Sequence, residues 1–282
     1  MTSPPDLPGV THLYHDLTTG VTAHVAHAGP QDGPPLLALH GFPQHFYAFR
    51  RLIDELGAEF RILAMDTRGL GWSGPAPDGD YRKARLAEDA LALLEALEIE
   101  RAGLVGHDWG AWVGFHAVLR APERFTGFVA AGAAHPWPSA AATLREAPRF
   151  LYQPPIAAAI LGPRIIPALV PRIVRAGWGD RATYDRAAED VYARAYRNPA
   201  RAEAASRYYR DFLRHEVLRN PTGRLTTPTR MLQGKEDPIG TRLAEGLDEH
   251  GDDARTELLE GCGHFVPEER PAELARAVRE VC

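Results

Sequence analysis

The sequence of 282 residues has very little cysteine and lysine. Cys262 and Cys282 are its only cysteines, too few for a disulfide scaffold, so we expect a cytoplasmic protein. Lys83 and Lys235 are the only lysines among 32 basic residues, which we attribute to GC-rich coding in a bacterial genome rather than to function. The net charge of −5 excludes a uniformly basic surface, so we expect no nucleic-acid partner.

We expect neither a secretory signal nor a membrane span in this sequence. Its N-terminus has neither a basic start nor an apolar run. The most apolar stretch, 156–174, is interrupted by Pro163, Pro167 and Pro171 and carries two arginines, which does not suit a spanning helix. We therefore expect short, broken helices in this stretch and no membrane partner.

Apolar runs typical of buried parallel strands alternate with amphipathic helical segments. Six such strands are expected at 35–39, 61–65, 102–106, 125–130, 229–233 and 255–259, and helices at 46–56, 84–97, 109–120 and 271–281. An antiparallel hairpin is expected at 11–17 and 21–28. This alternation predicts an α/β protein with a right-handed, doubly wound, mainly parallel sheet of eight strands.

The alternation stops near His135. From Pro136 to about Pro228 the sequence is helical and rich in proline, with no convincing strand. We therefore predict a core domain formed by residues 1–135 and 226–282, and a helical cap inserted at 136–225.

Gly106-His107-Asp108-Trp109-Gly110 has the glycine spacing of a nucleophile elbow. The motif follows an expected strand and precedes an expected helix, which is the context that an elbow requires. Asp108 occupies the central position, so the predicted nucleophile is a carboxylate. Alternatively, Asp108 only caps the helix that begins at Trp109, since aspartate is a favoured N-cap residue.

A triad in elbow order needs an acid after a later strand and a histidine after the last one. Asp237 follows the strand ending at Gln233, and His264 follows the strand ending at Leu259. We therefore predict Asp237 as the acid, with Glu236 as the weaker alternative, and His264 as the base. A histidine on a surface loop is the alternative for His264.

His40-Gly41-Phe42-Pro43 follows the first parallel strand. In this architecture the backbone N–H of Phe42, together with that of Trp109, is expected to form an oxyanion hole. We further expect His40, Trp112 and Trp137 to contact the substrate in an apolar, aromatic pocket.

Together these motifs resemble the α/β-hydrolase family, and within it the aspartate-nucleophile branch of epoxide hydrolases and haloalkane dehalogenases. The resemblance covers nearly the whole chain and extends to the loop 68–73 and to residues 261–269. It implies an α/β-hydrolase fold, a small-molecule substrate and a carboxylate attack on an sp³ carbon that bears a leaving group. His264 would then activate the water that hydrolyses the resulting Asp108 ester, with no metal or organic cofactor.

The leaving group separates the two activities. An epoxide oxygen needs a proton, for which cap tyrosines are suited. The segment 207–210 resembles the family's second-tyrosine segment, in which Tyr209 would be one donor; the alternative is that Tyr209 only packs. Tyr152 is our choice for the other donor, with Arg149 as the alternative. We predict an epoxide hydrolase that opens aromatic or lipophilic epoxides to vicinal diols.

A halide would instead need N–H donors. The resemblance assigns one to Trp109, but Phe42 stands where dehalogenases often carry a donating asparagine. Trp137 or Trp178 would have to replace it. A haloalkane dehalogenase and a non-catalytic ligand receptor on the same fold are therefore the alternatives. The sequence leaves open whether the protein is a monomer or a homodimer.

Overall fold

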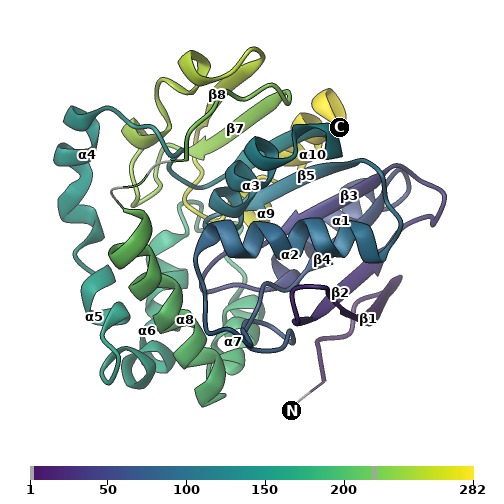
Figure 1. The fold of residues 1–282 in the computed structure, drawn as a ribbon. Helices are drawn as coiled ribbons and strands as arrows, with labels where there is room; N and C mark the ends of the chain where they lie inside the picture. Colours follow the sequence, from purple (N-terminus) through teal and green to yellow (C-terminus); the bar gives the residue numbers. More distant parts are fainter. Residues whose placement is uncertain (1–2, 218, 220) are drawn as a thin grey trace.

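The structure, a computed structural model, describes residues 3–217, 219 and 221–282. Met1 and Thr2, where the predicted core domain begins, and Leu218 and Asn220, within the predicted cap, lie outside the described residues. Helices lie on both sides of a central sheet, and a group of helices lies to one side of it (Figure 1).

The sheet has eight strands in the order β1-β2-β4-β3-β5-β6-β7-β8. β2 is antiparallel to both β1 and β4, and every other neighbouring pair is parallel. This confirms the predicted doubly wound, mainly parallel sheet. The strands are β1 (Val10–Asp16), β2 (Thr22–Ala28), β3 (Pro35–Leu39), β4 (Arg61–Met65), β5 (Ala102–His107), β6 (Phe125–Ala131), β7 (Thr229–Gly234) and β8 (Ala254–Leu259).

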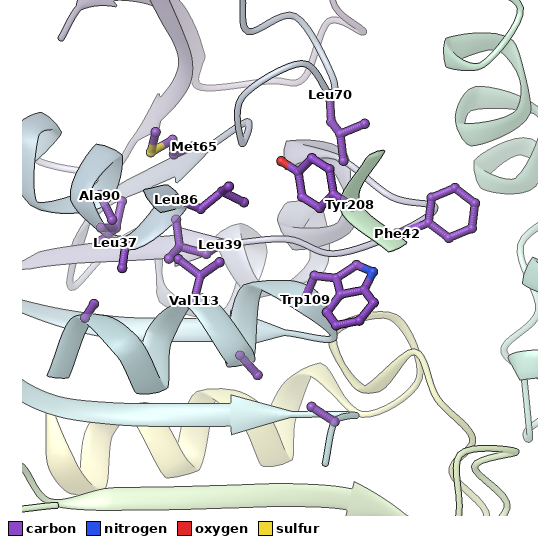
Figure 2. Close-up of a cluster of buried hydrophobic side chains, with 14 of the residues drawn as sticks. Leu37, Leu39, Phe42, Met65, Leu70, Leu86, Ala90, Trp109, Val113 and Tyr208 are labelled. Carbon is purple, nitrogen blue, oxygen red and sulfur yellow. The ribbon is translucent and has the colours of Figure 1, made fainter. Parts of the chain in front are cut away.

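Two buried apolar clusters lie on opposite faces of the sheet. On one face α2 (Lys83–Ala96) and α3 (Trp109–Arg120) pack on the central strands. On the other face lie η1 (Phe46–Phe49), α1 (Arg50–Leu56), α9 (Val266–Glu269) and α10 (Pro271–Val281). Figure 2 shows the first cluster running from Leu37 and Leu39 on β3 to Phe42, Trp109 and Tyr208. Short 3₁₀ turns are η2 (Pro122–Arg124), η5 (Arg242–Ala244) and η6 (Leu247–His250).

Between β6 and β7 the described residues are helical and form no strand. The cap helices, as we call them, are α4 (Ala140–Glu146), α5 (Gln153–Ala157), α6 (Gly162–Gly177), α7 (Arg186–Ala195) and α8 (Pro199–Asp211), with the short segments η3 (Ala147–Phe150) and η4 (Phe212–Glu216). The exact domain boundaries at 136 and 225 stay a prediction. No helix in the described part of the chain combines the length and apolar character that a bilayer span requires.

The expectation of broken helices in 156–174 is wrong for most of this stretch. α6 is continuous through Pro167 and Pro171. Pro167 and Pro171 are spaced by four residues, so the hydrogen bonds they remove lie along one side of the helix. Pro163 lies in the first turn, where an N–H would have no acceptor within the helix. The stripe formed by Ile166, Val170 and Val174 is fully buried. Burial of that stripe keeps the helix intact despite the missing donors.

Candidate active site

Asp108 lies in a sharp turn between β5 and α3. It has a φ of 53° and a ψ of −120°, a conformation that non-glycine residues rarely adopt. The flanking glycines are sterically required, because a Cβ on Gly110 would lie 1.9 Å from the Leu39 carbonyl oxygen and one on Gly106 would lie 2.5 Å from the Gly110 carbonyl oxygen. The turn therefore has the close packing of a strained elbow that projects one side chain.

The two oxygens of the Asp108 carboxylate have different surroundings. Oδ1 accepts a hydrogen bond from the backbone N–H of Phe42 at 2.7 Å. The amide of Trp109 is in the first turn of α3, where N–H groups have no carbonyl partner within the helix. Oδ2 lies 3.6 Å from Nε2 of His264. One oxygen thus faces a backbone donor, and the other faces the imidazole.

His264 is buried between β8 and α9 and is oriented by Asp237. Its Nδ1 lies 3.0 Å from Oδ2 of Asp237. The Asp237 carboxylate is itself fixed, since Oδ2 accepts from Gln233 Nε2 and Oδ1 from the backbone N–H of Ile239, both at 2.8 Å. Glu236, the weaker candidate for the acid, is exposed and points elsewhere. The geometry therefore brings together Asp108, His264 and Asp237.

The protonation state of His264 reflects its two carboxylate neighbours. Burial alone would disfavour the charged imidazolium, but Asp237 and Asp108 outweigh it and raise the pKa of His264 to about 10. In the free protein at neutral pH, His264 is therefore a cation.

A buried carboxylate that the sequence analysis did not single out holds the His264 loop. Glu269 accepts from the backbone N–H groups of Gly263 and Phe265, which flank the histidine, at 3.1 to 3.2 Å. It also accepts from Gly179 and Asp180, at the end of the cap helix α6, at 2.9 and 2.8 Å. Burial raises the pKa of Glu269, and these four backbone donors oppose that rise.

The same cap segment contacts the histidine directly. The backbone N–H of His264 donates to the carbonyl of Gly177 at 2.7 Å. The loop that carries His264 is thus held jointly by α9 and by the end of α6. The only sequence signal for this role is an acidic pair, Glu268 and Glu269, placed among apolar residues just after the histidine.

Two tyrosines of the cap helices approach the elbow. Tyr209, on α8, is buried, and its ring packs edge-on against Phe42 and Trp109. The ring of Tyr152, at the start of α5, lies 6.1 Å from that of Tyr209. Burial and the nearby charge of Asp108 raise the pKa of Tyr152, so this phenol keeps its proton. The pKa of Tyr209 is also raised, mainly by burial and the neighbouring Tyr152.

Arg149, the alternative to Tyr152, is placed differently. Its guanidinium bonds to the Glu146 carboxylate and, at 3.0 Å, to the carbonyl of Pro238. Tyr152, by contrast, contacts the ring of Tyr209. The geometry therefore pairs Tyr152, rather than Arg149, with Tyr209.

Two neighbouring cavities, which we call the larger and the smaller lobe, share lining residues at the elbow. The larger lobe measures about 690 Å³ and the smaller about 300 Å³. Asp108, Tyr152 and Ile239 line both. Trp109 and Trp112 line the larger lobe, and a substrate contact of Trp112 stays a prediction. The volumes suit a drug-sized organic molecule.

The expected substrate contacts of His40 and Trp137 need correction, because neither residue lines these lobes. His40 is fully buried, and its Nε2 accepts from the backbone N–H of Thr67 at 3.1 Å, which ties two loops together. Trp137 stacks on His250 and donates from Nε1 to the carbonyl of Pro221 at 2.7 Å. Backbone partners therefore hold both side chains away from the two lobes.

The tryptophans considered as replacement halide donors are already engaged. Trp178, like Trp137, is committed within the protein, since its Nε1 donates to Thr183 Oγ1 at 3.0 Å. Within the described residues, no group of three or more histidine, cysteine or acidic side chains is arranged to hold a metal ion.

Lys83 is a second buried residue that the sequence analysis did not assign to the site. Its Nζ lies 4.1 Å from the centre of the Trp109 ring and donates to the carbonyl of Tyr208 at 2.9 Å. It also pairs with Glu216 at 3.4 Å. The rarity of lysine in this arginine-rich chain is the one signal that could have singled it out.

Proteins of similar sequence and fold include several named hydrolases. The family model for the alpha/beta hydrolase fold matches residues 34–271. AB hydrolase superfamily protein YfhM of Bacillus subtilis (strain 168) is 30% identical over 93% of this chain and 95% of its own length. Soluble epoxide hydrolase of Corynebacterium sp. (strain C12) is 28% identical over 93% of each chain. The crystal structure of Cfl2 from Burkholderia cenocepacia matches with a TM-score of 0.83 and 26% identity over 99% of each chain.

Proposed function

Because the chain belongs to the α/β-hydrolase family, we propose that it opens an aromatic or lipophilic epoxide to a vicinal diol through an ester on Asp108. Its sequence relatives include several named epoxide hydrolases, and the chain is an epoxide hydrolase or a related α/β hydrolase. The observation that carries the finer proposal is the pair of protonated phenols, Tyr152 and Tyr209, beside the Asp108 carboxylate at one cavity.

In the first half-reaction, Oδ2 of Asp108 attacks one epoxide carbon. The bond from that carbon to the ring oxygen breaks, and the oxygen becomes an alkoxide on the neighbouring carbon. One of the two phenols donates its proton to this alkoxide, while the other donates a hydrogen bond. Oδ1, which already accepts from Phe42 N–H, becomes the carbonyl oxygen of the ester.

Proton transfers then prepare His264 to hydrolyse the ester. The phenolate recovers a proton from the His264 imidazolium through solvent, and the imidazole becomes a base. His264 Nε2 removes a proton from water, and the hydroxide attacks the carbonyl carbon of the Asp108 ester. The amides of Phe42 and Trp109 hold the negative charge that develops on the carbonyl oxygen.

Collapse of this intermediate releases the diol and restores the enzyme. The departing oxygen takes the proton that His264 removed from water. The carboxylic acid left on Asp108 returns its proton to His264, so the cycle consumes one epoxide and one water. Asp237 holds the imidazole in the orientation that each transfer needs.

Phenol donors favour an epoxide over a halide as the substrate group. An alkoxide has to be protonated, and a phenol that keeps its proton at neutral pH supplies it. A halide would need a second N–H donor, and both tryptophans considered for that role donate to other partners. These contacts support the epoxide hydrolase proposal over the dehalogenase alternative.

Intact mass of a His264→Ala variant tests the proposal directly. Without its base, the ester should persist on Asp108 after exposure to a styrene oxide, as an increase by the whole mass of the epoxide. An alkyl adduct from a haloalkane, lacking the halogen, would instead support the dehalogenase. No adduct from either compound would overturn both enzymatic hypotheses and favour a ligand receptor. Asp108→Asn/His264→Ala is the control and should take no adduct, provided that deamidation is excluded.

A further inference from the structure

The two lobes differ sharply in charge. Apart from Asp108, the described residues that line the larger lobe include no acidic residue, lysine or arginine. Its walls are mainly aromatic, proline and aliphatic groups such as Trp112, Phe150 and Leu213. This lobe suits an uncharged, apolar substituent, because burying a charge there would lack a compensating partner.

The smaller lobe carries two arginines, Arg149 and Arg172. No acidic side chain other than Asp108 is among the described residues that line it. Arg172 donates to the carbonyl of Ala168 at 2.7 Å, within its own helix, and forms no ion pair with a described residue. Its positive charge is therefore not neutralised by the protein.

The charge of Arg149 is only partly neutralised. Its carboxylate partner, Glu146, also binds Arg242 at 3.1 Å, so one acidic group is shared by two guanidinium groups. Both Arg149 and Arg172 are exposed, which places the positive end of the lobe toward solvent. The other end of this lobe shares Asp108 and Tyr152 with the larger lobe.

We infer that the preferred substrate is an epoxide substituted on both carbons, with an apolar group for the larger lobe and a chain ending in a carboxylate for the smaller one. This inference rests on the proposed function. Asp108 lines both lobes, so each epoxide carbon can place its substituent in a different lobe. A planar carboxylate matches the two parallel N–H groups that a guanidinium offers.

Neighbouring arginines on the same helix provide an internal comparison. Arg175, three residues after Arg172, lines neither lobe, and its guanidinium binds both oxygens of Glu189 at 2.7 and 2.9 Å. Arg175 therefore has a structural partner and Arg172 does not. This contrast makes Arg175 the matched control for a role of Arg172 in substrate recognition.

The test compares paired substrates on the wild-type enzyme, Arg172→Gln and Arg175→Gln. Both members of a pair carry a phenyl group on one epoxide carbon and a methylene spacer on the other. The spacer ends in a carboxylate in one member and in the matching primary amide in the other. The spacer length is varied, because it has to reach from the elbow to the arginine. Styrene oxide, which has no second substituent, reports the basal epoxide hydrolase activity.

In the wild-type enzyme, kcat/KM should favour the best acid over its amide by about fivefold, the effect of one solvent-exposed ion pair. Arg172→Gln should bring the ratio close to one, whereas Arg175→Gln should keep it. Added salt should reduce the wild-type preference, because it screens exposed charges. Turnover of styrene oxide should be the same in Arg175→Gln as in the wild-type enzyme.

Two results would overturn the inference while leaving the proposed function intact. One is equal kcat/KM for acids and amides at every spacer length in an enzyme that hydrolyses styrene oxide. The other is a preference for acids that Arg172→Gln does not change. An enzyme that turns over none of the epoxides would overturn the proposed function as well.

Discussion

At the scale of single residues, the charge of Asp108 controls when His264 can act as a base. In the free enzyme Asp108 and Asp237 together raise the pKa of His264 to about 10, so the imidazole is protonated at neutral pH. An ester on Asp108 is uncharged and removes one of these two influences. The histidine therefore becomes a base only after the intermediate that it has to hydrolyse has formed.

This coupling predicts a difference between two titrations. Hydrolysis of the ester in a single turnover should increase with pH and level off with an apparent pKa clearly below 10, because only Asp237 remains as a charged neighbour. An NMR titration of His264 in the free enzyme should give the higher value. Asp108→Asn, which removes the same charge without a substrate, should lower the NMR value too. Equal pKa values in the free and esterified states would contradict the coupling.

Glu269 and Glu268 are adjacent buried carboxylates with different partners, which allows a matched comparison. Glu269→Gln places an amide NH₂ group among backbone N–H donors and should displace the His264 loop. Hydrolysis of the ester should slow about tenfold or more, while ester formation changes little, because only hydrolysis needs the base. Quenched-flow mass spectrometry of the covalent intermediate measures both steps.

Glu268→Gln is the control for that comparison. Glu268 pairs with Arg50 at 2.6 Å and bonds to the Tyr192 hydroxyl, and its side chain accepts nothing from the His264 loop. This variant should lower the melting temperature without changing the ratio of the two half-reactions. If both variants slow the two steps equally, Glu269 has only a structural role.

At the scale of elements, a buried ion pair joins α2 of the core to the cap helices. Lys83 is fully buried, and its backbone N–H and Nζ both contact Glu216 in η4, at 2.7 and 3.4 Å. Nζ also donates to the carbonyl of Tyr208 on α8. Burial lowers the pKa of Lys83, and Glu216 is the main group that opposes this. The pair therefore fixes the end of the cap beside Trp109.

Lys83→Met should leave Glu216 buried without its partner and lower the free energy of unfolding by about 3–5 kcal/mol. Lys83→Met/Glu216→Gln should recover about 2 kcal/mol, because glutamine removes the unpaired charge and still accepts from the backbone N–H. Urea unfolding measures all three proteins. Lys235→Met is the control, since Lys235 pairs with the exposed Glu260 and should change stability by less than about 0.5 kcal/mol. A loss in Lys83→Met no larger than in this control would exclude the buried pair as an anchor.

The strands were the most predictable elements. All eight lie within one residue of their expected ends. The parallel strands are short apolar runs that stop at glycine or polar loops, and β1 and β2 flank a turn that contains Gly20. α6 was not predictable from local signals, since Pro167 and Pro171 indicate a break that tertiary packing overrides.

Within the site, the elbow spacing and the order of acid and histidine predicted which loops converge. The sequence favoured Asp237 over Glu236 as the acid, but it could not show that the Ile239 amide fixes the Asp237 carboxylate. Nor could it show that His40 and Trp137 are held by distant backbone groups. The uneven charge of the two lobes depends on cap residues that are brought together only by folding.

At the scale of the whole molecule, histidines with shifted pKa values lower the free energy of unfolding on both sides of neutral pH. Burial lowers the pKa of His27 and His107 to about 4 and that of His45 to about 3. Between these values and the ordinary value of 6.5, the unfolded chain binds more protons than the folded one, so stability rises with pH. His264 has the opposite sign, since its raised pKa gives stability that is fully present below 6.5 and is lost as pH rises toward 10.

The free energy of unfolding should therefore be greatest near neutral pH and fall on both sides. Urea unfolding across the range from pH 4 to 10 measures the profile. His27→Gln should reduce the acid-side slope alone, and His264→Gln the alkaline-side slope alone. A profile in which either variant changes the opposite side would contradict these assignments.

The positions at which the chain leaves and rejoins the sheet separate the residues of the triad from many of the residues that line the two lobes. β6 and β7 are hydrogen-bonded neighbours, yet all the cap helices lie between them in sequence. The chain therefore leaves the sheet for the cap helices and returns to it at the neighbouring strand. The inserted segment does not include Asp108, Asp237 or His264. It does include Tyr152, Arg172 and many of the other residues that line the two lobes. One exchange or duplication of that segment would give a lineage a new choice of substrate while leaving its nucleophile, acid and base untouched.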